Sequence, residues 1–185
     1  HPPNSTDPAP PCKHPRVYGW NMQHCSDCKT DLGDARLQRE TKHAKKAKAE
    51  DAQRTPEEQS IACHQRGVSV PWLLAFTFDH DCWSWPTWRV VRDIICAATS
   101  HDRCRYADLP QVQPFVGPAD VFISHCWGSP WGDLVCAAAA GARSDRRVWI
   151  DIFAVRQWPG NDADLDFRGV IARCNAVIVA VSRVD

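Results

Sequence analysis

Four residues near the N-terminus have the types and the spacing of a zinc site. Cys25 and Cys28 form a C-x2-C motif, in which two thiolates on one tight turn reach the same tetrahedral ion at about 2.3 Å. Cys12 and His14 supply the other half of the site, and His24 competes with His14 for the fourth position. Because protein ligands would fill all four positions, the predicted metal is structural zinc. Two alternatives stay open: a redox C-x2-C motif, or surface thiols unrelated to one another.

A second, looser group of metal-ligating types lies further along the chain. It consists of Cys63, His64, His80 and Cys82. Which of these residues meet depends on a fold that their spacing does not fix. His and Cys at such spacings more often mark helix faces and a Trp-rich core, so we predict no metal there.

A third group combines polar and aromatic side chains around the ends of predicted strands. Ser124, His125 and Trp127 end the first apolar strand, and Asp151 lies near the end of the second. Open α/β sheets bind ligands at the carboxyl ends of their strands. We therefore predict a cofactor site there that also includes Trp158, in a long loop (154–166) expected to be mobile over the crevice. The chain has no G-x-G-x-x-G motif and no P-loop, which excludes an ordinary dinucleotide or triphosphate cradle.

The elements that must position this site alternate between unbroken apolar runs and helical segments. We predict strands over residues 119–125, 146–153 and 175–182, and helices between them over 131–142 and 167–174. Apolar strands separated by helices predict a parallel sheet covered on both faces. Right-handed crossovers allow the strand order 2-1-3, with Val121 to Ser124 in the middle. The third strand would then be an apolar edge, so we expect more sheet to follow Asp185 in a longer protein.

The sequence upstream of this sheet divides into four segments of different composition. We predict a disordered leader with five Pro over residues 1–11 and a zinc ribbon over 12–33. A charged helical connector is predicted over 34–54, a Trp-rich helical region over 55–117, and a partial α/β domain over 118–185. Thr55, followed by Pro and two acids, predicts a helix start, and Gly67 predicts its end. A second helix is predicted from Thr87 or Trp88 to about Ala98.

Charge and cysteine content narrow the class of protein. The 22 basic and 22 acidic residues cancel, so only a local patch, such as the basic residues between Arg36 and Lys48, could bind nucleic acid. Ten scattered Cys are too few for a disulfide scaffold and favour a reducing, cytoplasmic location. We predict Cys96, Cys136 and Cys174 to be core residues. No segment reaches the roughly 18 apolar residues of a membrane span, and no signal peptide is visible.

The motifs of the C-terminal part resemble one known family. The first strand reads F-x-S-H-x-W from Phe122, and the second reads W-x-D-I-F-x-x-x-Q from Trp149. These motifs resemble the Toll/interleukin-1 receptor (TIR) domain family, most closely its divergent algal and protist branch. The resemblance covers residues 119–185 and extends in character to the Trp-rich stretch before them.

The resemblance implies a flavodoxin-like sheet, assembly through contacts between TIR domains and, in some members, hydrolysis of NAD. It makes 121–125 the first strand, 154–166 the loop that gates the site and makes assembly contacts, and 175–182 the third strand. In the family, the catalytic Glu lies on a helix after the third strand, whereas no Glu follows Glu58 here. The resemblance therefore implies no catalytic residue in this chain.

Two functional hypotheses from different classes follow. The first is a TIR-like interaction and signalling module with a structural zinc site, in which NAD hydrolysis is expected only in a longer parent protein. The second is a zinc-ribbon adaptor that binds nucleic acid or a protein partner through residues 12–54.

Overall fold

The structure is a computed structural model that describes residues 17–18, 24–25, 49 and 52–182. The chain forms two compact units, residues 1–39 and 40–185, and each is described by itself. In the first unit, β1 (Val17–Tyr18) pairs antiparallel with β2 (His24–Cys25), and Val17 lies opposite Cys25. The predicted disordered leader and most of the predicted ribbon and connector lie outside the described residues.

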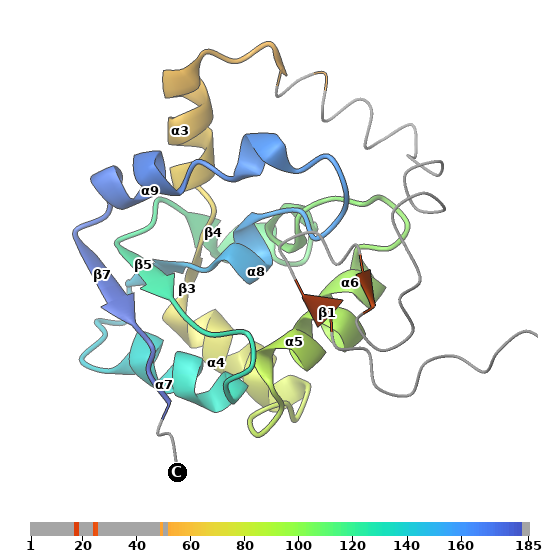
Figure 1. Ribbon diagram of the computed structural model, residues 1–185. Coiled ribbons are helices and arrows are strands. Elements are labelled where there is room, and N and C mark those ends of the chain that lie inside the picture. Colours follow the sequence, from red (N-terminus) through yellow and green to blue (C-terminus); the bar gives the residue numbers. More distant parts are fainter. Residues whose placement is uncertain (1–16, 19–23, 26–48, 50–51, 183–185) are drawn as a thin grey trace, which may run out of the picture. The chain divides into compact units, whose positions relative to one another are not determined.

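The second unit is built around a five-stranded mixed sheet with the order β4-β3-β6-β5-β7 (Figure 1). In chain order, the strands are β3 (Gly67–Ser69), β4 (Val116–Gly117), β5 (Val121–Ser124), β6 (Arg147–Trp149) and β7 (Ala176–Val179). The central strand β5 pairs in parallel with β6 and β7, while β3 pairs antiparallel with β6 and β4. Helices lie between the strands, so the predicted α/β class is confirmed.

The sheet is broader than the sequence predicts. All three predicted strands are present, and β5 lies between β6 and β7. Two short strands, β3 and β4, extend the sheet antiparallel beyond β6, where we predicted only helices and connecting segments. Strands of two or three residues are too short to show an alternating pattern. Residues 55–117 thus contribute strands to the same sheet as residues 118–185. The five strands form a mixed sheet rather than a wholly parallel, flavodoxin-like one.

The helices before the parallel strands begin where local signals place them. Helix α3 (Pro56–His64) starts at a capping box, in which Glu58 N donates to Thr55 Oγ1 at 3.3 Å and Thr55 N donates to the Glu58 carboxylate at 2.8 Å. This confirms the predicted helix start. After β3, Ser69 caps α4 (Val70–Asp79) by accepting from Trp72 N.

The predicted helix near Thr87 is present as one continuous helical run. It consists of α5 (Thr87–Val90), a π-helical turn η1 (Val91–Ile95) and α6 (Cys96–Ala98). Val91 and Ile95 on this run are fully buried. Two 3₁₀ turns follow, η2 (Tyr106–Asp108) and η3 (Gln113–Phe115).

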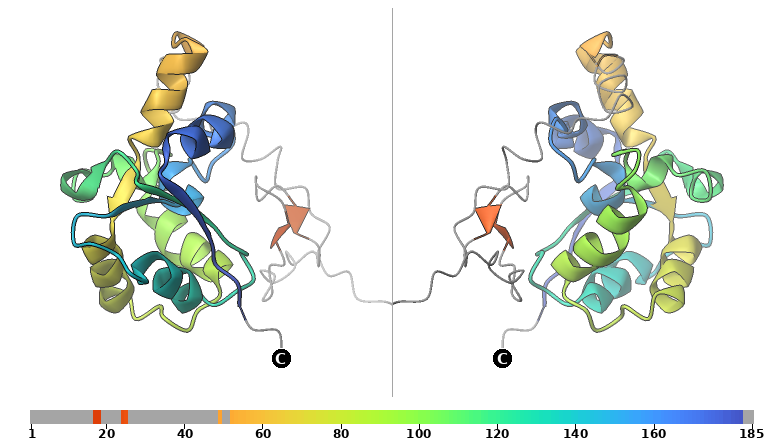
Figure 2. Two further views of the ribbon diagram at one scale, coloured as in Figure 1. Left: turned by 90° about the vertical axis from the view of Figure 1, so that its left-hand side faces the viewer. Right: turned by 90° about the vertical axis from the view of Figure 1, so that its right-hand side faces the viewer.

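The remaining helices surround the parallel strands and, together with α3 and α4, form two layers (Figures 1 and 2). They are α7 (Trp131–Ala139), α8 (Asp151–Ala154), the 3₁₀ turn η4 (Asp162–Asp164) and α9 (Phe167–Arg173). Helix α9 packs against α3 and β5, where Phe122 and Trp149 stack at 5.0 Å. Helix α7 packs against α4, where Trp131 meets Phe76 edge to face.

The orientation of α7 corrects one prediction about the core. The helix buries Trp131, Leu134, Val135 and Ala138, at the i, i+3, i+4 and i+7 spacing of one helix face. Cys136 falls on the opposite side and is exposed, so its prediction as a core residue is wrong. Cys96 and Cys174 are half-buried.

Within the part of the chain that the structure describes, none of the helices combines the length and the apolar character needed to span a membrane.

Candidate functional site

Three of the five residues predicted to form the cofactor site come together. His125 and Trp127 follow β5, and Asp151 begins α8 two positions after the last residue of β6. His125 Nε2 lies 3.6 Å from Asp151 Oδ1, and the two side chains are only 4% and 9% exposed. The Asp151 carboxylate also accepts a hydrogen bond from Ile152 N at 2.8 Å and one from the Trp127 side chain. These residues form the strand-end cluster: His125, Trp127 and Asp151.

Electrostatics in the strand-end cluster are dominated by burial. Burial raises the pKa of Asp151, against the opposing effects of His125 and of the hydrogen bonds from Ile152 and Trp127. Among the described residues, His125 Nε2 is buried without a hydrogen-bond partner, because 3.6 Å is too long for a hydrogen bond. The cluster therefore holds a desolvated carboxylate beside an imidazole nitrogen with unused hydrogen-bonding capacity.

The Trp-rich segment holds the loop that carries His125 and Trp127. Trp88 N donates to Trp127 O at 2.9 Å, Thr87 N donates to Ser129 O at 2.9 Å, and Trp131 N donates to Trp85 O at 2.7 Å. The backbone after β5 is therefore fixed from residues about 40 positions earlier in the chain. This contact explains why the Trp-rich stretch and the α/β segment belong to one compact unit.

The other two predicted site residues lie apart from this cluster. Ser124 is exposed at the end of β5, and its carbonyl accepts a hydrogen bond from Ala180 N at 2.8 Å. Trp158 Nε1 donates to Thr99 Oγ1 at 3.0 Å, and the Arg103 guanidinium lies 5.5 Å from the Trp158 ring centroid. Trp158 thus anchors the loop on the helical run that ends at Ala98.

The loop 154–166 is pinned by a buried ionic cluster that the sequence did not reveal. Asp164 is fully buried and accepts hydrogen bonds from three guanidinium groups. The distances are 2.9 Å from Arg66 Nη1, 2.8 Å from Arg105 Nε and 2.8 Å from Arg156 Nε. The prediction that this loop is mobile around Asp164 is therefore wrong. Arg66 and Arg105 lie far from Asp164 in the sequence, and no local pattern marks such a pairing.

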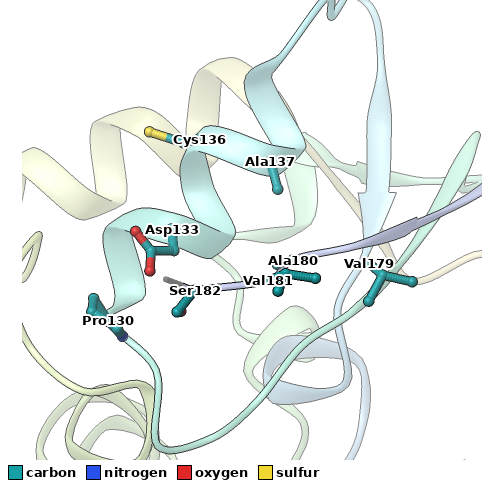
Figure 3. A pocket seen from close by; sticks show the side chains of 8 residues that line it. All are labelled: Pro130, Asp133, Cys136, Ala137, Val179, Ala180, Val181 and Ser182. Atoms are coloured by element: carbon teal, nitrogen blue, oxygen red, sulfur yellow. The ribbon is translucent and has the colours of Figure 1, made fainter. Parts of the chain in front are cut away.

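A groove opens between α7 and the segment that continues β7 (Figure 3). Its volume is about 640 Å³. The lining is mostly apolar and comes from Pro130, Asp133, Cys136, Ala137, Val179, Ala180, Val181 and Ser182. Asp133, in the first turn of α7, is the acidic residue of the lining (Figure 3). The groove therefore combines apolar walls with one carboxylate.

The predicted zinc site falls mostly outside the described residues. Cys12, His14 and Cys28 are not described, while Cys25 lies on β2. In the described part of the chain, no group of three or more His, Cys, Asp or Glu side chains could hold a metal ion. The residues of the looser group, Cys63, His64, His80 and Cys82, are among those described and do not form such a group. Cys63 and Cys82 are buried, and His64 Nε2 lies 2.8 Å from Ala119 O.

Comparison with known proteins identifies no relative: no family model, no curated protein and no solved structure matches this chain. The resemblance to TIR domains therefore stays a prediction from the strand motifs.

Proposed function

We propose that this chain is a TIR-like interaction module that acts by associating with further copies of itself. The observation that carries the proposal is the apolar, exposed surface of β7. Val177, Val179 and, just after the strand, Val181 are 47%, 63% and 80% exposed. β7 is also an edge strand of the five-stranded sheet.

An apolar edge of this kind favours association for two reasons. The outer side of an edge strand presents backbone groups that can pair with another chain, and natural proteins normally blunt such edges with charge or Pro. Here, β7 consists of Ala and branched apolar residues only. Contiguous exposed apolar surface is typical of interaction sites. The opposite edge strand, β4, has two residues and is followed by Pro118, which limits pairing there.

Catalysis is not part of the proposed function of this chain. NAD hydrolysis of the family's kind needs a Glu, and the sequence has none after Glu58. We propose that a longer parent protein would supply it, and that NAD would then bind near His125, Trp127 and Asp151. The buried carboxylate of Asp151 supports a functional role for these strand ends, since perturbed pKa values gather at such sites. Incubation of this chain with NAD should release no nicotinamide.

The association can be tested by sedimentation velocity over a hundredfold range of protein concentration. We expect the weight-average mass to rise with concentration, and Val179→Asp to keep the protein monomeric by placing a charge on the apolar edge. Phe78→Asp is the matched control, because Phe78 is exposed on α4, away from β7. A constant monomer mass for the unmodified protein over the whole range would exclude self-association.

A second candidate function is a zinc-dependent adaptor formed by residues 12–54. The pairing of β1 with β2 favours it, because a short hairpin that carries Cys25 is a common scaffold for a zinc ribbon. We expect one zinc per chain, lost in Cys25→Ser, together with salt-sensitive binding of single-stranded DNA or RNA. Freshly purified protein without zinc would remove this candidate.

A further inference from the structure

We propose that the copies associate head to tail: α9 of one copy docks into the groove between α7 and the β7 segment of the next. In this contact, Arg168 faces the Asp133 of the neighbouring copy, and Ile171 enters between its valines. The inference rests on the proposed self-association and identifies the two surfaces that meet.

The groove offers two kinds of contact. Its walls include Ala137, Val179 and Val181, which suit an aliphatic side chain. Its polar groups are the half-buried carboxylate of Asp133 and Ser182 Oγ, which is buried without a hydrogen-bond partner among the described residues. A buried hydroxyl without a partner costs free energy until a donor or acceptor reaches it. The groove therefore fits an aliphatic side chain accompanied by a cation with several N–H donors.

Helix α9 presents that combination on one face. Ile171 is 40% exposed, and Arg168 is exposed three residues earlier, so the two side chains are neighbours on the helix surface. Within the described residues, neither Arg168 nor Asp133 belongs to an ion pair. Arg173, by contrast, is used inside the chain, where it donates to Ser60 Oγ at 2.8 Å. Arg168 is thus the charge that α9 has available for a partner.

The positions of the two surfaces determine the kind of assembly. Helix α9 packs with Phe122 on one face of the sheet. Helix α7 packs through Trp131 against Phe76 and Phe153, in the other layer with α4. One copy can therefore use its α9 and its groove at the same time. A contact between two different surfaces that does not close on itself produces open chains rather than dimers.

Charge reversal tests this contact by sedimentation velocity. We expect Asp133→Arg and Arg168→Asp each to weaken association by roughly fivefold or more, because like charges then meet in the groove. The double variant Asp133→Arg/Arg168→Asp should recover association, since it restores an opposite pair. Circular dichroism checks that each variant is folded, and Asp133→Asn provides a milder change at the same position.

Mixing the two single variants gives the sharpest result. The Asp133→Arg copy keeps a functional α9, and the Arg168→Asp copy keeps a functional groove. In the mixture, positions 168 and 133 carry opposite charges at both kinds of contact, so it should form alternating head-to-tail chains although each variant alone associates weakly. A mixture that stops at one-to-one dimers, or that does not associate at all, would contradict a head-to-tail contact.

The apolar part of the contact has a matched control. Ile171→Ser should weaken association, whereas Ile61→Ser should not, because Ile61 on α3 has nearly the same exposure, 43%, but belongs neither to α9 nor to the lining of the groove. Association that persists unchanged in both charge variants and in Ile171→Ser would overturn the contact and leave the proposed function standing. A monomeric unmodified protein would overturn both.

Discussion

The guanidinium of Arg66 donates a hydrogen bond to the carboxylate of Asp164 across 2.9 Å, which joins the end of α3 to the loop after α8. Arg105 and Arg156 donate to the same carboxylate. Burial alone would raise the pKa of Asp164, but the charges of these three arginines outweigh it and lower that pKa to about 2. This ionic cluster fixes the loop 154–166 to two segments that are distant in the sequence.

Removing the carboxylate at position 164 should destabilise the protein strongly. Asp164→Asn leaves three buried guanidinium groups without the negative charge that they share, so we expect a loss of about 3–5 kcal/mol of unfolding free energy. Urea denaturation followed by Trp fluorescence measures it. Asp162→Asn is the control, because Asp162 is exposed on the same 3₁₀ turn and should change stability by less than about 0.5 kcal/mol. Equal midpoints for the two variants would contradict the role of Asp164.

Acid should unfold the protein partly through the same carboxylate. The pKa of Asp164 is lower in the folded state, at about 2, than the value of about 3.9 expected in the unfolded state. The folded state therefore binds fewer protons in this range, and the contribution of Asp164 is complete above about pH 4 and is lost as the pH falls toward 2. We expect the stability of the unmodified protein to fall more steeply between pH 4 and pH 2 than that of Asp164→Asn. Parallel curves would show that the cluster is not linked to protonation.

Asp151 should show the opposite dependence on pH. Burial raises its pKa in the folded state, so its ionisation costs stability as the pH rises above the ordinary value of about 3.9. Asp151→Asn removes that cost and still accepts the hydrogen bond from Ile152 N. We expect the variant to gain, relative to the unmodified protein, on the order of 1 kcal/mol between pH 4 and pH 7, measured by urea denaturation.

The exposed Asp145 provides the reference for this change. Asp145→Asn should not change the stability difference between pH 4 and pH 7. If Asp151→Asn also leaves that difference unchanged, the carboxylate at 151 is not desolvated in solution as the structure places it.

Local signals in the sequence predicted the elements whose stability depends on near neighbours. The capping box at Thr55 specified the start of α3, and the apolar run from Val121 specified a buried strand. The placement of polar residues after these strands also indicated that His125, Trp127 and Asp151 would lie close together. Trp158 was grouped with them because it follows the second strand, but its side chain bonds to Thr99. Sequence order gives the position of a loop residue along the chain, and packing decides which way it points.

What the sequence determined by itself is the α/β alternation, since the 2-residue and 3.6-residue periods of strands and helices are local properties. The tertiary structure alone decided the antiparallel addition of β3 and β4 and the convergence of three arginines on Asp164. Each of these depends on contacts between residues that are far apart in the sequence. Such contacts form because burial of the core compensates the entropy of closing long loops, and no short pattern of residues records which partners will meet.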